Sequence, residues 1–200
     1  MIRYPNGETY NGATKKRKRR QSDLELSLSA ANRGMDFEND INISCDYYRE
    51  HNIALIYKRP TPINIVKVDY THGAKIVDAY FETQSTTDYN GVYKGRYLDF
   101  EAKNTKSKTS FPLANISKHQ IEHLKKVLAH SGIAFFLISF QSLNEVYLLD
   151  AKHIIDCYEN QVRKSIPISD IKKHGILVKE GYNPRLYFLD AVDELYFKNK

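Results

Sequence analysis

Three charged side chains, Asp88, Glu101 and Lys103, have a spacing that suits metal-dependent chemistry. If the chain reverses in a two-residue turn at Lys94–Gly95, Asp88 and Glu101 each stand six residues from the turn. Residues equally distant from a hairpin turn lie opposite each other, with Cβ atoms about 4.5–5.5 Å apart. Lys103 follows Glu101 by two residues, so it projects from the same face of its strand.

Two opposed carboxylates destabilise a sheet unless something neutralises them. A divalent cation between them would do so, and oxygen ligands favour Mg²⁺ or Mn²⁺. Two alternatives stay open at this point. Such charges also occur on solvated hairpins, and Asn90–Gly91 is the stronger signal for a type I′ turn. We predict the turn at Lys94–Gly95 because it leaves the longer alternation of polar and apolar residues on the second strand.

The excess positive charge of the chain is concentrated at its N-terminus. The 200 residues carry 30 basic and 24 acidic side chains, a net charge of +6. Residues 1–20 hold seven of the basic groups and one acidic group. The remaining residues therefore have a net charge of zero. Such a run is a solvated tail, an address signal or a phosphate-binding segment, and six phosphate contacts would give a log-affinity slope against log salt of about −5. The basic run comprises Lys15, Lys16, Arg17, Lys18, Arg19 and Arg20.

Several classes of protein do not fit the composition. The sequence has no apolar run of 18 residues, so we expect no membrane partner. The first residues are polar and then basic, which is not the pattern of a signal peptide. Cys45 and Cys157 are too few for a disulfide framework and show no metal-ligand spacing. We therefore expect a cytoplasmic protein.

Alternating patterns along the chain predict an α/β fold, with a mixed central sheet flanked by helices. We expect a flexible tail at 1–30 and one domain at 31–200, with 58–84 as an insertion of two strands. The expected helices are 34–50, a segment from Asn115 or Ser117 to about His130, 151–159, a turn at 169–174, and 191–197. The expected strands are 53–57, 63–70, 75–81, the hairpin within 85–103, 133–140 and 145–149, with a polar loop at 106–112.

Seven blocks of sequence carry a resemblance to a known family. In chain order they are Met1-Ile-Arg-Tyr-Pro-Asn-Gly7, Asn32-Arg-Gly-Met35, Lys58-Arg-Pro-Thr-Pro62, Ser85-Thr-Thr-Asp-Tyr-Asn-Gly91, Asp99-Phe-Glu-Ala-Lys103, Lys108-Thr-Ser-Phe-Pro112 and His119-Gln-Ile-Glu-His123. These blocks are similar to the RecU family of Holliday-junction resolvases, within the PD-(D/E)xK nuclease superfamily. The similarity runs from Met1 to about Phe197. Thr87 stands where the superfamily name has Pro, a departure that RecU-like sequences share.

The resemblance implies a restriction-endonuclease-like resolvase core. It also implies that the insertion at 58–84 projects as a stalk that engages the crossover of a DNA four-way junction. The residues alone favour two ordinary extra strands of the sheet there. Basic candidates for DNA contact in this segment are Lys58, Arg59, Lys67 and Lys75. The resemblance further implies a homodimer, with the RecA recombinase and a branch-migration motor as protein partners.

Site roles follow from chemistry and from the resemblance. Asp88 and Glu101 are the expected metal ligands, and Lys103 would orient the attacking water or stabilise charge on the phosphate. Similar nucleases imply three further metal contacts, namely the Ala102 carbonyl, Glu38 and Thr87.

Two more residues are candidates for DNA contact. Arg33 precedes a predicted helix, where a phosphate would bind well. Gln120 either closes a capping box with Ser117 or, by resemblance, lies near the site.

Together these features predict a structure-selective endonuclease that makes paired, metal-dependent nicks in Holliday junctions. One alternative is a duplex nuclease of the same superfamily. Another is a junction-binding recombination modulator without catalytic activity.

Overall fold

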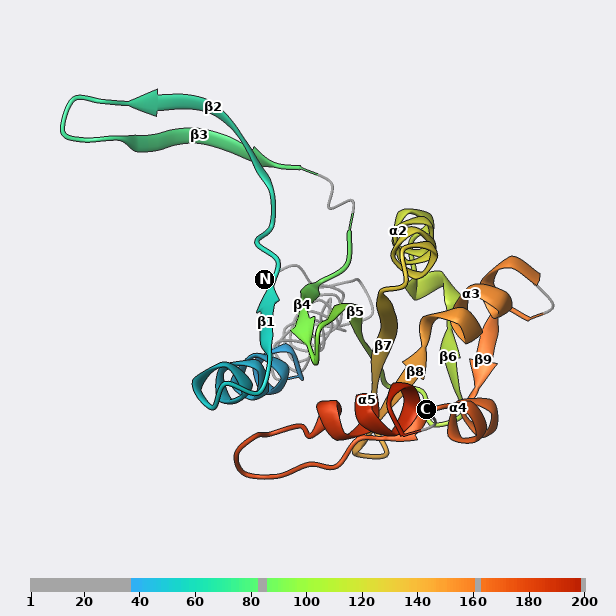
Figure 1. Ribbon diagram of the computed structural model, residues 1–200. Coiled ribbons are helices and arrows are strands. Elements are labelled where there is room, and N and C mark those ends of the chain that lie inside the picture. The colour runs from blue at the N-terminus through green and yellow to red at the C-terminus, as the bar shows by residue number, and fades with distance from the viewer. Residues whose placement is uncertain (1–36, 83–85, 161–162, 199–200) are drawn as a thin grey trace, which may run out of the picture. The chain divides into compact units, whose positions relative to one another are not determined.

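The computed structural model describes residues 37–82, 86–160 and 163–198 (Figure 1). The chain divides into two units, Met1–Asn39 and Asp40–Lys200. Of the first unit only residues 37–39 are described, at the start of a helix that spans 37–50. The tail predicted at 1–30, with its basic run, therefore lies outside the described residues, as does Arg33.

A six-stranded mixed sheet forms the centre of the second unit, which confirms the predicted α/β class. Its strand order is β1-β4-β5-β7-β8-β10. The pair β5–β7 is parallel and the other pairs are antiparallel. The strands are β1 (Leu55–Lys58), β4 (Tyr89–Tyr93), β5 (Arg96–Thr105), β7 (Ile133–Phe140), β8 (Glu145–Asp150) and β10 (Ile176–Leu177).

The β4–β5 hairpin turns at Lys94–Gly95, as predicted. Both residues have positive φ, 47° and 73°, which a type I′ turn requires. Strand pairing runs from Tyr93 opposite Arg96 to Tyr89 opposite Phe100. Gly91, in the alternative turn signal, lies inside β4, where a Cβ atom would come 2.1 Å from a backbone oxygen of β1.

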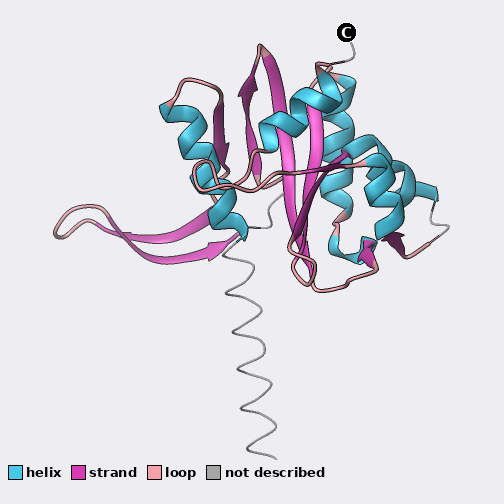
Figure 2. Ribbon diagram, turned by 90° about the horizontal axis from the view of Figure 1, so that it is seen from below, coloured by secondary structure: helices cyan, strands magenta, loops and turns pink. Residues whose placement is uncertain are grey.

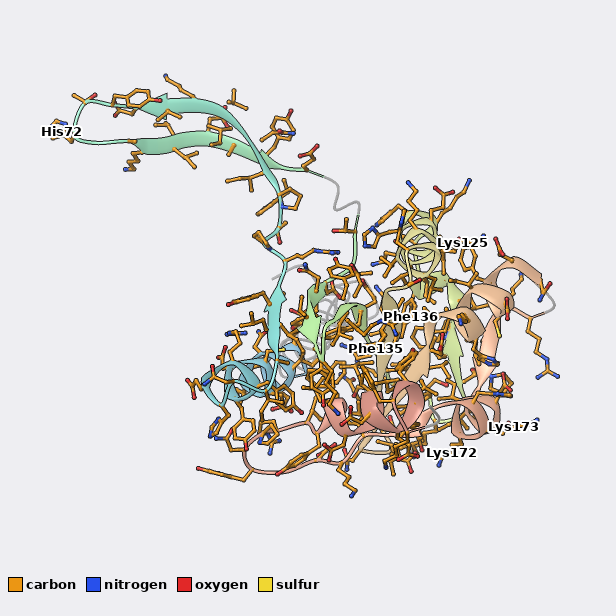
Figure 3. All side chains as sticks on the ribbon, in the orientation of Figure 1. His72, Lys125, Phe135, Phe136, Lys172 and Lys173 are labelled. Atoms are coloured by element: carbon orange, nitrogen blue, oxygen red, sulfur yellow. The ribbon has the colours of Figure 1, made fainter. Side chains whose placement is uncertain are left out.

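Strand β7 is buried over its whole length, because helices cover both faces of the sheet (Figure 2). Phe135 and Phe136, labelled in Figure 3, are neighbours on this strand and point to opposite faces. On one face Phe136 belongs to a core shared with Leu124 and Ile154. Those residues come from α2 (Lys118–Ala129) and α3 (Ala151–Asn160).

The opposite face of the sheet packs through aromatic rings. Phe135 stacks on Phe100 with ring centroids 4.6 Å apart. Phe188, in α5 (Phe188–Tyr196), lies 5.5 Å from Phe100. Phe100 is on β5, so this packing buries one face of that strand. The residues that alternate with Phe100 point to the other face.

Strands β2 (Ile63–Asp69) and β3 (Lys75–Phe81) form a two-stranded sheet of their own. We call this pair the stalk hairpin. Figure 1 shows it as a separate ribbon, connected to the main sheet through the ends of β1 and β4. His72 lies at its tip (Figure 3). Every residue of β3 is exposed, although the strand is mostly apolar.

Short elements were missing from the sequence prediction. The expected loop at 106–112 contains β6 (Ser110–Pro112), which pairs with β9 (Ser165–Pro167). Strand β10 was not predicted either, and α5 begins three residues earlier than expected. Strands of two or three residues show no periodic pattern, which explains these errors.

The remaining described elements are a short 3₁₀ helix at Leu113–Asn115 and α4 (Ile168–His174). Across the described ranges, no helix combines the length and the apolar character needed to cross a membrane.

Candidate metal centre

The face of β5 that turns toward α2 carries a row of polar residues, Asp99, Glu101 and Lys103. In the parallel pair Glu101 lies beside Phe136, so it points to the same face as the core under α2. Asp99 and Glu101 are almost completely buried, at 0% and 1% exposure. Burial of two carboxyl groups side by side on one strand requires dedicated partners.

Asp88 lies opposite Glu101, as the predicted register requires. The Asp88 N–H donates to Glu101 Oε2 at 3.2 Å, and the Ala102 N–H donates to Asp88 Oδ2 at 3.2 Å. Ala102 also pairs with Leu137 in the parallel β5–β7 pair. A metal contact for the Ala102 carbonyl stays a prediction.

The electrostatics of this pair favour a bound cation. Burial and the neighbouring Asp88 charge raise the pKa of Glu101 to about 8, against the lowering effect of Lys103. Lys103 Nζ lies 2.7 Å from Glu101 Oε1 and is the positive group that partly balances the site. Two carboxylates and a carbonyl are hard oxygen donors, which fit Mg²⁺ or Mn²⁺.

Helix α2 contributes Gln120 to the site. Gln120 Oε1 accepts the Ser117 N–H at 3.0 Å, so the predicted capping box is present, with Ser117 as the N-cap. Gln120 Nε2 donates to Glu101 Oε1. One amide thus closes the helix end and holds the buried carboxylate, so the two interpretations of Gln120 are both correct. Contact with DNA stays a prediction.

Asp99 is the centre of a second polar network that the sequence analysis missed. Its Oδ2 accepts from Arg59 Nη2 at 2.7 Å and from the Tyr97 hydroxyl at 2.8 Å, and it lies 3.0 Å from His123 Nε2. Its Oδ1 accepts from the Thr87 hydroxyl. Burial works to raise the pKa of Asp99, but these hydrogen bonds and the Arg59 charge outweigh it and hold the pKa below its usual value.

Spacing could have revealed the second network. Asp99 precedes Glu101 by two residues on one strand, and His123 follows Gln120 by three on one helix. Either spacing places a side chain next to one that was already a candidate.

The other predicted site residues come from different elements. Glu38 is half-buried in the helix at 37–50 and belongs to the first unit. Lys58 ends β1. On the stalk hairpin, Lys67 is opposite Asp78 and Lys75 is opposite Asp69.

Thr87 and Arg59 bond to each other as well as to Asp99. The structure therefore groups both with Asp99. A metal contact for Thr87 and a DNA contact for Arg59 stay predictions.

Comparison with known proteins places the chain in a family. A family model described as Recombination protein U matches residues 32–194. The Holliday junction resolvase RecU of Bacillus cytotoxicus is 50% identical over 201 residues, covering 98% of each chain. The protein of the same name from Bacillus cereus strain AH820 is 52% identical with the same coverage.

Among solved structures, Archaeoglobus fulgidus Hjc, a Holliday junction resolvase, is 13% identical with a TM-score of 0.42. That match covers 71% of this chain and 93% of the other. The family model spans most of the chain, and two full-length relatives share half of its residues. The chain therefore belongs to the RecU family.

Proposed function

We propose that this protein is a metal-dependent endonuclease that resolves DNA four-way junctions by paired nicks in opposed strands. The observation that carries the proposal is the buried Glu101 carboxyl facing Asp88, with Lys103 Nζ 2.7 Å from it. The relatives named Holliday junction resolvase RecU support the junction as the substrate.

Mg²⁺ or Mn²⁺ is the proposed cofactor, held by Asp88, Glu101 and the Ala102 carbonyl. When bound, such an ion supplies an acidic water near neutral pH and stabilises charge on the leaving oxygen. Lys103 would stabilise negative charge on the scissile phosphate, a task that suits a compact ammonium group.

Two other residues position this centre. Gln120 fixes the orientation of the Glu101 carboxylate through its amide. Arg59 connects the two polar networks, because its backbone N–H donates to the Asp88 carbonyl at 2.8 Å while its guanidinium binds Asp99. The Asp99 network thereby holds the segment that carries Asp88 against β5.

The stalk hairpin is the proposed junction-selecting element. Its opposite charges are paired across the strands, so it offers little net charge to phosphates. It offers exposed aromatic rings instead, since Tyr70, Tyr80 and Phe81 are 74%, 59% and 79% exposed. Aromatic rings stack on unpaired bases in single-stranded DNA, and the crossover of a junction presents such base faces. The basic tail would add affinity for phosphates.

A homodimer follows from the substrate. A four-way junction has near two-fold symmetry and must be cut on two opposed strands, which matches a C₂ pair of sites. The family resemblance adds the RecA recombinase and a branch-migration motor as proposed partners. We also propose that the protein is cytoplasmic, because the proposed substrate is a junction in chromosomal DNA.

The proposal can be tested by nicking of a labelled four-way junction beside linear duplex, with Mg²⁺, Mn²⁺ or EDTA. Wild type should nick the junction in pairs with metal and not with EDTA. Glu101→Gln should lose nicking, while Glu122→Gln, an exposed carboxyl on α2, should retain it. Equal cleavage of linear duplex would indicate a duplex nuclease. Junction binding without nicking under any metal would indicate a non-catalytic modulator.

A further inference from the structure

A cluster of metal-ligating side chains lies on α3 and α4, on different elements from the Asp88–Glu101 centre. His153 and Cys157 are one helical turn apart on α3. Asp170 and His174 are one helical turn apart on α4. Residues four apart on a helix share a face, so each helix presents a pair of ligand types to its neighbour.

The ligand atoms converge on one point. His153 Nε2 lies 3.0 Å from Asp170 Oδ2 and 3.8 Å from Cys157 Sγ. The ligand atoms of His153, Cys157 and Asp170 all lie within 4.8 Å of one another. Zinc bonds of about 2.0–2.3 Å in a tetrahedral arrangement place ligand atoms about 3.3–3.8 Å apart. The observed separations therefore need only a small adjustment around a central ion.

The donor types identify the class of metal. An imidazole, a thiolate and a carboxylate form a mixed set that suits Zn²⁺, whereas Mg²⁺ binds oxygen donors. The three groups are half-buried, which leaves them reachable from solvent. They line a cavity of about 580 Å³. A fourth coordination position would open into this cavity.

His174 supports the cluster from the outside. Its ring stacks on His153 with centroids 4.4 Å apart, and its Nε2 lies 3.5 Å from Asp170 Oδ1. Contacts of this kind orient a ligating ring and a ligating carboxylate. The site thus has both ligands and the partners that hold the ligands in place.

We propose that His153, Cys157 and Asp170 form a zinc site that fastens α3 to α4. Binding replaces the thiol proton of Cys157 by the metal, and the proton passes to solvent. The segment between the two helices includes β9, which pairs with β6. The site would therefore stabilise the small β6–β9 sheet.

Cobalt(II) is the probe for this site, because it replaces zinc and shows a thiolate charge-transfer band. Full-length wild type should develop the band, and Zn²⁺ should abolish it and raise Tm. Cys157→Ser and Asp170→Asn should weaken zinc binding by more than about 100-fold, since even supporting residues contribute about 10–100-fold. Cys157→Ser should also lack the band.

Two control variants separate this site from other metal binding. Cys45→Ala removes the other thiol, which is 2% exposed, and should keep the band. Glu101→Gln removes the proposed nuclease centre and should also keep it, so failure of either proposal can be recognised alone. Circular dichroism checks that each variant is folded. Absence of the band in wild type, or its persistence in folded Cys157→Ser, would overturn the proposal.

Discussion

Strands β7 and β2 both carry several large apolar residues but have opposite surroundings. The β7 sequence is Ile-Ala-Phe-Phe-Leu-Ile-Ser-Phe, and all eight residues are buried. The β2 sequence is Ile-Asn-Ile-Val-Lys-Val-Asp, and five of its seven residues are exposed. Helices cover both faces of β7, whereas β2 pairs only with β3 among the described strands. The continuous apolar run of β7 predicts a strand buried on both faces, and the structure confirms it. The mixed sequence of β2 predicts a strand but not what covers it.

The contrast assigns different tasks to the two regions. A two-stranded hairpin is marginally stable by itself in water. Contiguous exposed apolar surface usually marks an interaction site. We therefore expect the stalk hairpin to gain stability from a bound surface, while the main sheet supports Asp88, Glu101 and Lys103.

Matched phenylalanine substitutions give the largest expected difference between the regions. Phe136→Ala removes a ring with 0% exposure and should lower the free energy of unfolding by about 3–5 kcal/mol. Phe81→Ala removes a ring that is 79% exposed and should change it by less than about 0.5 kcal/mol. Urea unfolding of the free protein measures both. A comparable loss in both variants would show that the hairpin packs against the core in solution.

Matched aspartate substitutions sharpen the comparison for charged groups. Asp99→Ala leaves the Arg59 guanidinium, whose side chain is 17% exposed, without its carboxylate. Breaking a buried pair costs about 3 kcal/mol or more. Asp78→Ala, opposite Lys67 on the exposed hairpin, should cost less than about 0.5 kcal/mol. Equal losses of unfolding free energy in the two variants, measured by urea unfolding, would show that the Asp99 network does not support the site.

The pH dependence of stability gives a smaller effect that is specific to the site. Without metal, the pKa of Glu101 is raised to about 8, above its ordinary value of 4.5. Its stabilising contribution is therefore complete below about pH 4.5 and is lost as pH rises through about 8. In EDTA, Tm of wild type relative to Glu101→Gln should fall across this range. A difference in Tm that stays constant with pH would mean that the pKa of Glu101 is not raised.

The Asp88–Glu101 register could be predicted because a two-residue turn fixes all pairings that follow it. The Gln120 capping box could be predicted because it depends on residues close in sequence. Neither pattern shows which helix residue packs over which strand residue, so the contact between Asp99 and His123 was not predicted. Their contact joins a strand to a helix that follows it by a long connection.

The cluster on α3 and α4 was missed for the same reason. Cys157 has no second cysteine at ligand spacing, and the pairing of His153 with Asp170 arises only when two helices pack together. The short strands β6 and β9 likewise form only by pairing with each other. The sequence of either one alone contains no signal for a strand.

The most direct test of the account compares junction binding and junction nicking in two variants, Glu101→Gln and a protein with residues 61–80 shortened to a turn. We expect Glu101→Gln to bind junctions like wild type and to make no nicks. The shortened protein should fold, and should lose its preference for junctions over linear duplex in both binding and nicking. A shortened protein that still prefers junctions, or a Glu101→Gln protein that still makes paired nicks, would contradict the division of tasks between hairpin and sheet.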